Sequence, residues 1–341
     1  MSRSATMIGA LAAAFAIGWI PGREAAGAAG YCTQTALGAN TACGLEARDD
    51  YAKAQAICIN VSDAVERTAC QSEAGVARSE ALELCGDQLR ARKAVCAAIG
   101  EGRYDPDFDP EDFEGEFDDQ DDLNRYLPLA IGNRWKFAGG GEIVQIEVLD
   151  ETKLIEGVTC IVVNDVVTID GELVEDTDDW FAQAENGDVY YFGEEVKDYE
   201  SFEGDAPRNP ELVSIDGSFK VGRDGDKPGI SFKGAPRAGQ VYRQEFSLGN
   251  AEDMAEVLST TYRFGSNADL DRGVPRQLAD QLCAGDCVVT REFSALDPEA
   301  HERKYYAPGI GFFLQVDIAT GGVVQLVDCS FDARCARLPA P

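Results

Sequence analysis

Acidic side chains beside aromatic residues are the groups in this sequence whose types and spacing could do chemistry. Each stands next to the aromatic residues of an expected strand, where burial would shift its pKa; these acids are Asp179, Glu194, Glu245, Glu252 and Asp253. Two carboxylates with separated pKa values are enough for glycoside hydrolysis. With 61 acidic residues, however, some pair always looks suitable, and ion pairs with Arg243 and Lys304 are the commoner use. We therefore assign no catalytic residue.

The same stretches contain candidates for ligand binding. Aromatic rings often line ligand pockets inside curved sheets, although filling the core is their more common use. The rings of this kind are Trp180, Tyr190, Phe192, Tyr305 and Phe313. Together with neighbouring polar groups, the ligand-binding candidates are Asp179, Trp180, Gln183, Tyr190, Phe192, Glu194, Glu245, Lys304 and Tyr305.

An acidic run is the candidate metal site. Eleven carboxylates lie between Asp105 and Asp122, with no basic residue among them. Five of them occupy the ligand positions of an EF-hand calcium loop: Asp105, Asp107, Asp109, Glu111 and Glu116. Pro110 stands where that loop needs a glycine, and Asp112 replaces its usual apolar residue. A solvated linker or a looser cation site is the commoner use of such a run, so calcium is the one cofactor expected, and only weakly.

Other catalytic and binding devices are missing from the sequence. His301 is the only histidine, and its polar surroundings are typical of a surface residue rather than of a catalytic triad or a zinc site. The glycine run 139–141 precedes a strand, so it predicts a turn and not a phosphate loop. No basic aromatic stripe for nucleic acid appears, and a net charge of -31 repels nucleic acid and anionic lipid.

Six of the eleven cysteines are spaced symmetrically. They fall at 32, 43, 58, 70, 85 and 96, in steps of 11, 15, 12, 15 and 11. A helical hairpin folded near residue 64 would place three pairs opposite one another: Cys58–Cys70, Cys43–Cys85 and Cys32–Cys96. The segment 60–63 is suited to a turn, and Asp63 to an N-cap. A rival scheme folds near Gly75 and pairs 70 with 85, 58 with 96, and 32 with 43.

The remaining cysteines predict two short cross-links and a free thiol. Cys283–Cys287 and Cys329–Cys335 each close a small loop. The odd count leaves Cys160, which lies on an apolar strand and is expected to be buried and unreactive.

Short alternating strands follow the helical segment. The pair Asn186-Gly187 between two aromatic runs predicts a β-hairpin with a type I′ turn, spanning 178–194. Other strands are expected at 144–148, 153–156, 160–167, 230–232, 241–246, 288–293, 303–306, 312–316 and 323–327, with one helix at 251–258. The predicted fold class is α+β, with a disulfide-linked helical hairpin followed by an antiparallel β-domain, either an open β-barrel-like sheet or a curved one.

The N-terminus predicts export. Arg3, an apolar run from Met7 to Ile20 and the small residues 26–28 form a signal-peptide pattern. The expected division is signal peptide 1–28, cysteine-rich hairpin 29–103, acidic connector 104–125, β-domain 126–328, and disulfide loop and tail 329–341. The protein is thus expected to be secreted or periplasmic, with no integral membrane segment after signal cleavage.

Several pieces of the β-domain also carry a resemblance. They are the stretches 157–165, 179–183, 189–194, 242–246, 251–254 and 304–311, which contain DWFAQ, VYYFGE, YRQEF, AEDM and KYYAPGIG. In this order they resemble an uncharacterised family of secreted bacterial β-proteins across residues 126–328. The resemblance implies fold kinship and export, and no known activity.

These observations favour an exported, non-enzymatic protein whose β-domain binds a small ligand, a cell-surface partner or calcium. The alternative is a carboxylate-dependent, glycosidase-like hydrolase that uses the acids near the central hairpin.

Overall fold

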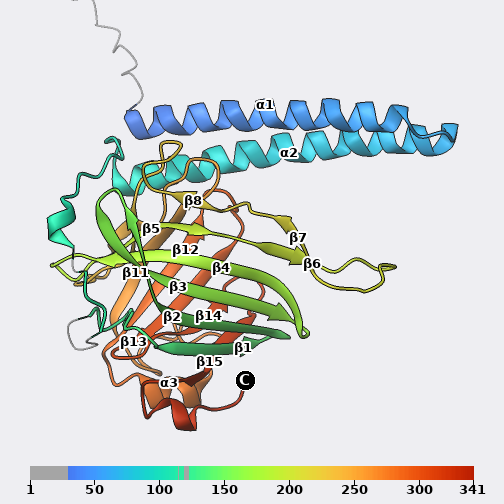
Figure 1. The fold of residues 1–341 in the computed structure, drawn as a ribbon. Helices are drawn as coiled ribbons and strands as arrows, with labels where there is room; N and C mark the ends of the chain where they lie inside the picture. Colours follow the sequence, from blue (N-terminus) through green and yellow to red (C-terminus); the bar gives the residue numbers. More distant parts are fainter. Residues whose placement is uncertain (1–29, 114, 119–122) are drawn as a thin grey trace, which may run out of the picture.

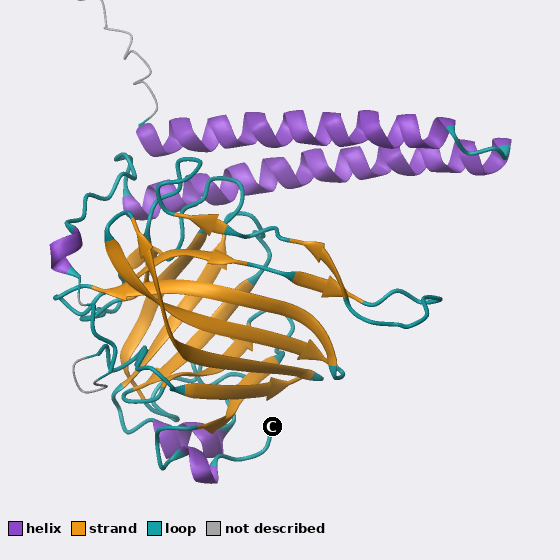
Figure 2. Cartoon of the chain, viewed as in Figure 1, coloured by secondary structure: helices purple, strands orange, loops and turns teal. Residues whose placement is uncertain are grey.

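The computed structural model describes residues 30–113, 115–118 and 123–341, and it combines two long helices with a large antiparallel sheet (Figures 1 and 2). The α+β fold class expected from the sequence is confirmed. The expected signal peptide, residues 1–28, lies outside the described residues.

The N-terminal helices form an antiparallel hairpin, α1 (Tyr31–Ile59) and α2 (Ala64–Ile99). The turn lies at the expected place, because the Asp63 carboxylate caps α2 by accepting from the backbone N–H groups of Val65 and Glu66, at 2.8 and 3.0 Å. The side chains buried between the helices are mostly small, such as Ala36, Ala39 and Ala47. This contact is too thin to hold two long helices together by burial alone.

Disulfides supply the missing cohesion. Cys32–Cys96, Cys43–Cys85 and Cys58–Cys70 form the symmetric ladder predicted from the spacing, with Cα–Cα distances of 5.6, 5.8 and 5.6 Å. Cys283–Cys287 and Cys329–Cys335 are also bonded, and Cys160 is free and buried, as predicted. The rival pairing around Gly75 is wrong. The hairpin can therefore project its closed end well beyond the sheet (Figure 1).

Within the described residues, fifteen strands form one antiparallel sheet. They are β1 Arg134–Gly139, β2 Glu142–Ile155, β3 Val158–Ile169, β4 Glu172–Gln183, β5 Val189–Glu195, β6 Asp198–Glu200, β7 Glu211–Ser214, β8 Phe219–Lys220, β9 Gly229–Phe232, β10 Val241–Arg243, β11 Asp253–Tyr262, β12 Cys287–Ser294, β13 His301–Ala307, β14 Gly311–Asp317 and β15 Val323–Cys329. Each predicted strand lies wholly or partly in one of these, and the two predicted at 144–148 and 153–156 belong to the single long β2.

The sheet is strongly curved but not closed. The main path runs from β10 through β11–β15 to β1–β5 and β8, while β9 pairs with β5. Curvature brings β9 near β10. Beside these strands, the Gln244 side chain donates to the Ser231 carbonyl at 3.3 Å, and the backbones of Lys227 and Phe246 form an isolated antiparallel β-bridge. Strands far apart in the path therefore face one another across the concave face (Figure 2).

The central hairpin β4–β5 is present, but its turn differs from the prediction. Gly187 has a φ of 80°, whereas Asn186 is not left-handed, and the Gly187 N–H donates to the Ala184 carbonyl at 2.8 Å. This is a four-residue turn that ends on a left-handed glycine, a common alternative to type I′. The extra residue fits the irregular register of the two strands between Trp180 and Phe181.

The prediction of a helix at 251–258 is wrong. Those residues belong largely to β11, which is paired with β10 on one side and β12 on the other. Ala, Glu, Met and Leu favour helices, but the two ladders of hydrogen bonds override that weak preference. The helix of this region is instead α3 (Arg276–Leu282), whose Leu278 and Ala279 are fully buried against the outer face of the sheet.

The acidic connector packs on the β-domain instead of spanning solvent. Phe108 and Phe113 lie edge-on against Phe192 of β5, each at a ring distance of 5.5 Å, around the short 3-10 helix η1 (Pro110–Asp112). The C-terminal loop behaves similarly, because Phe331 packs on Trp135 beside the short 3-10 helix η3 (Cys335–Arg337). Among the described residues, no helix is long and apolar enough to cross a membrane.

Candidate functional site

The concave face of the sheet contains a small cavity of about 220 Å³. Its walls are mainly apolar and include aromatic rings from β1, β4, β9, β13 and β14, among them Phe137, Phe181, Phe232, Tyr306 and Phe312. Three charged residues also line it, namely Asp165, Asp179 and Lys304. Because these strands are widely separated in the sheet, only its curvature can bring their side chains together.

Strand register places the carboxylates on this face. On β3, Asp165 follows Val163 by two residues, so both side chains point to the same side of the pleat. Asp179 of β4 lies directly opposite Val163 on one side and Glu194 of β5 on the other. Two acids in directly opposed positions repel each other when both are ionised.

Burial raises the pKa values of both members of this opposed pair. The pKa of Asp179 rises to about 7, because burial disfavours its charge and outweighs the hydrogen bond that it accepts from the Tyr191 hydroxyl. The pKa of Glu194 rises to about 9, from burial first and then from the charge of Asp179. At neutral pH, Glu194 is therefore protonated and Asp179 is divided between its two forms.

Asp165 is the least compensated acid of the site. Burial raises its pKa well above the ordinary value, and the charges of Asp179 and Glu175 add to the effect. Its Oδ1 has no hydrogen-bond partner among the described residues. A buried carboxylate oxygen without a donor is costly, so Asp165 is either protonated or in need of a positive partner.

Glu292 shows the opposite situation. It accepts hydrogen bonds from the Tyr306 and Thr290 hydroxyls, at 2.7 and 2.9 Å, and its Oε2 lies 2.8 Å from Lys304 Nζ. Burial alone would raise the pKa of Glu292, but Lys304 and these hydrogen bonds outweigh it and lower the pKa. The positive charge of Lys304 is thus shared between ion pairs with Glu292 and Glu302. Lys304 forms no ion pair with Asp165 or Asp179 among the described residues, although its more distant charge lowers the pKa of Asp165 in part.

Further acids extend this region beyond the cavity. Burial raises the pKa of Glu245 well above its usual value, with the charges of Asp253 and Glu194 as the next causes. The pKa of Asp253 is raised by burial as well. We call Asp165, Asp179, Glu194, Glu245 and Asp253 the acid cluster, because the charges of Asp179 and Asp253 raise the pKa values of the other three.

The structure divides the predicted ligand-binding residues between separate places. Asp179 and Lys304 line the cavity, and Glu194 and Glu245 belong to the same concave face. Trp180, Tyr190 and Phe192 lie on the outer face of β4 and β5, in a cluster that the connector covers. Their role is packing.

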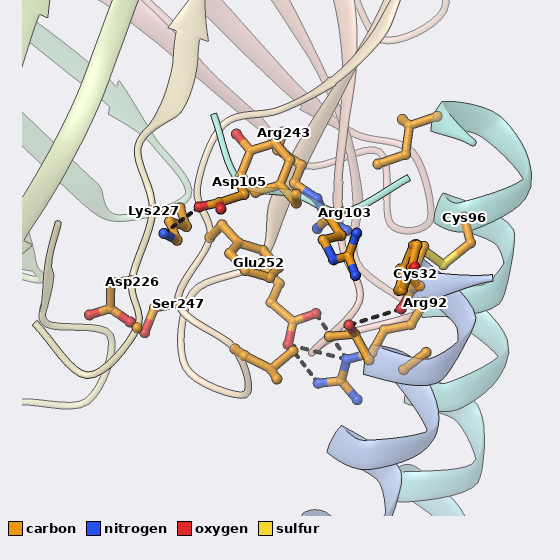
Figure 3. A pocket seen from close by; sticks show the side chains of 18 of the residues that line it. Cys32, Arg92, Cys96, Arg103, Asp105, Asp226, Lys227, Arg243, Ser247 and Glu252 are labelled. Carbon is orange, nitrogen blue, oxygen red and sulfur yellow. Dashed lines mark hydrogen bonds and ion pairs between the residues drawn. A yellow bond between two sulfur atoms is a disulfide. The ribbon is translucent and has the colours of Figure 1, made fainter. Parts of the chain in front are cut away.

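Gln183 and Tyr305 are also structural. The Gln183 side-chain oxygen accepts from the backbone N–H of Asn124 at 2.6 Å, which fastens the end of the connector to β4. Tyr305 is fully buried against Tyr262, and its hydroxyl donates to the Leu270 carbonyl at 2.5 Å. Glu252, considered above as a possible acid, forms an ion pair with Arg92 of α2 instead (Figure 3).

Asp165 and the cavity rings were missed by sequence reasoning. A signal was available for Asp165, because it stands in phase with Ile161 and Val163 on a strand whose inward positions are otherwise apolar. Phe137, Phe232 and Phe312 had no such signal, since their meeting depends on the curvature of the whole sheet.

The expected calcium loop does not form a metal site. Among the described residues, no group of three or more potential metal ligands is placed to hold an ion. Asp105 pairs with Lys227 at 2.6 Å, and the Asp109 carboxylate accepts from the Glu111 N–H at the start of η1. Pro110 and the partly buried Phe108 and Phe113 hold the described part of the connector against the β-domain, so the carboxylates of this part do not gather around one centre.

Comparison with known proteins does not add a functional assignment. No protein-family model matches the chain, and neither the curated proteins nor the solved structures include a similar one. The resemblance to a family of secreted β-proteins therefore stays a prediction from the sequence motifs.

Proposed function

We propose that the protein binds a small organic cation, a primary or quaternary ammonium, in the concave-face cavity and carries out no reaction there. The observation that carries the proposal is Asp165, an enclosed carboxylate with an unpartnered Oδ1 at the wall of an aromatic cavity. An ammonium group would supply the missing positive charge. Aromatic faces attract cations as well, and the rings around the cavity offer such faces.

The balance of charge supports a cation over an anion. Lys304 is the basic residue at the cavity wall, and its ammonium lies 2.8 Å from Glu292 and 3.9 Å from Glu302. The acid cluster has no comparable partner. An anionic ligand would meet repulsion from Asp165 and Asp179, whereas a cation would relieve it.

An exported location fits this role. Five disulfides favour an oxidising compartment, and the N-terminal pattern predicts a signal peptide. We infer that the protein meets its ligand outside the cytoplasm.

Isothermal titration calorimetry tests the binding proposal. Tetramethylammonium should bind saturably, while tert-butanol, a neutral molecule of similar shape, should not. Asp165→Asn should weaken cation binding about tenfold or more, because it removes the carboxyl group that would ionise to pair with the cation. Asp178→Asn is the matched control, since Asp178 faces the opposite side, where it accepts from Asn164 at 3.1 Å. Equal binding of the two ligands, or unchanged affinity in Asp165→Asn, would contradict the proposal.

A carboxylate-dependent hydrolase is the second candidate, and the opposed pair Asp179 and Glu194 favours it. Their pKa values of about 7 and about 9 would leave one acid able to accept a proton and the other able to donate one. Hydrolysis of aryl glycosides by the wild-type protein, abolished in both Asp179→Asn and Glu194→Gln, would establish this function. Absence of turnover across aryl glycosides of differing sugars would leave cation binding as the function.

A further inference from the structure

A groove of about 1260 Å³ lies at the junction between the helical hairpin and the β-domain (Figure 3). Its walls come from the start of α1, the end of α2, the first residues of the connector, and the segment 218–252. No residue lines both this groove and the concave-face cavity, and no member of the acid cluster lines the groove.

The junction is held by a buried ion pair. The Arg92 guanidinium of α2 donates to both carboxylate oxygens of Glu252, at 2.8 to 3.1 Å, and the two side chains are only 6% and 2% exposed. Glu252 also accepts from the Gly249 N–H at 2.7 Å. This bidentate contact fixes the groove walls relative to each other.

Basic residues outnumber acidic ones along the groove, five to four, in a chain whose net charge is -31. Three pairs neutralise each other: Arg92 with Glu252, Lys227 with Asp105 at 2.6 Å, and Arg223 with Asp224 at 3.4 Å. The remaining acid, Asp226, is 7% exposed and accepts from the Lys220 N–H of its own loop. Arg103 and Arg243 are therefore the two basic residues of the groove that have no carboxylate partner among the described residues.

These two arginines are held by aromatic rings instead of carboxylates. The Arg103 guanidinium carbon lies 3.7 Å from the centre of the Tyr31 ring. That of Arg243 lies 5.2 Å from the Tyr104 ring and 4.8 Å from the Phe246 ring. Neither forms an ion pair within the part of the chain that the structure describes. Stacking engages the face of a guanidinium and leaves the N–H groups in its plane able to donate. For Arg243, one of these groups, on Nη1, makes a long contact of 3.9 Å to the Met254 sulfur.

Arg243 is the more enclosed of the two. Its Nε is buried and has no hydrogen-bond partner among the described residues. Burial of this cation without a matching anion lowers its pKa. Tyr104, next to Arg103 in the chain, connects the two arginines, since its ring contacts Arg243 and its hydroxyl donates to the Pro228 carbonyl at 2.8 Å.

We propose that this groove binds an organic anion whose carboxylate or phosphate group is held by Arg103 and Arg243. The planar fork of each guanidinium matches two oxygens of either group. Tyr31, Tyr104 and Phe246 position the forks and add apolar wall, so an anion with an aromatic or sugar body fits better than a bare ion. The site joins the helical hairpin to the β-domain, and occupancy would tighten that junction.

Calorimetric titration of the full-length protein with benzoate, phenyl phosphate and inorganic phosphate tests the site. Benzoate and phenyl phosphate separate the two anionic groups, and inorganic phosphate lacks the apolar body. We expect saturable binding of at least one organic anion. The affinity should fall about tenfold or more in Arg103→Gln and in Arg243→Lys. The second variant keeps the positive charge but loses the planar pair of guanidinium donors. Arg134→Gln on β1 is the control and should bind as the wild type does.

Melting curves followed by circular dichroism separate loss of binding from loss of folding. Arg103 is exposed, so Arg103→Gln should melt as the wild type does, and saturating benzoate or phenyl phosphate should raise the melting temperature of the wild type only. The proposal is overturned if no probe saturates, or if both arginine variants bind as tightly as Arg134→Gln.

Discussion

Two acidic side chains of the concave face have pKa values far above those of ordinary carboxyl groups. Asp179 and Glu194 lie directly opposite each other on two paired strands, and burial together with the charge of Asp179 keeps Glu194 protonated at neutral pH. Protein interiors avoid such pairs unless the arrangement has a use, because opposed like charges destabilise a sheet. In this fold, the use that we infer is to receive a positively charged ligand.

Asp179→Asn should change how stability depends on pH. A carboxyl whose pKa rises from about 4 in the unfolded chain to about 7 in the folded protein binds a proton that unfolding releases. The free energy of unfolding therefore falls as pH increases between these values. Asparagine cannot titrate, so the variant should match the wild type near pH 4 and exceed it near pH 8 by a few kcal/mol, on the order set by about 1.4 kcal/mol per pKa unit.

Urea unfolding at several pH values measures this effect, with Asp178→Asn as the control on the opposite face. An Asp179→Asn variant that loses more stability than the control at pH 8 would show that the Asp179 charge is favourable in the folded protein.

Cys160 should be unreactive in the folded protein. It is fully buried on the outer face of β3, and burial raises the pKa of its thiol to about 12. A thiol reagent at pH 8 should modify it only after denaturant is added, and then once per chain. Mass spectrometry of the labelled protein gives the count, and rapid labelling without denaturant would contradict the buried position.

At the scale of elements, disulfides and small side chains replace a hydrophobic core in the helical hairpin. The double variant Cys43→Ala/Cys85→Ala should lower the free energy of unfolding of the hairpin by about 2–3 kcal/mol, because that bond closes a long loop. Cys58→Ala/Cys70→Ala is the matched control, with a sequence separation of 12 against 42, and should cost less. Urea unfolding followed by helical circular dichroism compares them, and the reverse order would contradict the loop-entropy account.

Local patterns in the sequence were sufficient for some elements. The cysteine spacing predicted the three hairpin disulfides, and the aromatic runs on either side of Asn186-Gly187 predicted the strands of the central hairpin. The same reasoning placed a helix at 251–258, where pairing with β10 and β12 imposes a strand. It also gave the Asn186-Gly187 turn the wrong type, because the bulge in β4–β5 follows from register and not from the turn residues alone.

The sites were harder to predict, since they depend on contacts between distant residues. Asp179 and Lys304 were identified as neighbours of aromatics, yet most of those aromatics pack on the outer face. Arg103 and Arg243 meet at one groove only because α2 docks beside β10, which no short sequence pattern encodes.

The whole molecule combines two proposed sites, one for a cation and one for an anion. The inner surface of the sheet concentrates buried acids, whereas the junction with the hairpin leaves two arginines without carboxylate partners. Because the net charge is -31, the electrostatic potential around the protein is negative in general. The acid cluster adds to this negative potential, whereas the two arginines of the groove oppose it locally.

Proton release on cation binding is the most direct test of the central claim, that the concave face binds a cation through acids with raised pKa values. Calorimetry of tetramethylammonium binding at pH 7, repeated in phosphate and in Tris, separates protons released from the heat of binding. Because a bound cation favours the ionised forms of Asp165 and Asp179, the account predicts net proton release and tighter binding at pH 8 than at pH 6. Binding heats that are the same in both buffers, with an affinity independent of pH, would contradict it.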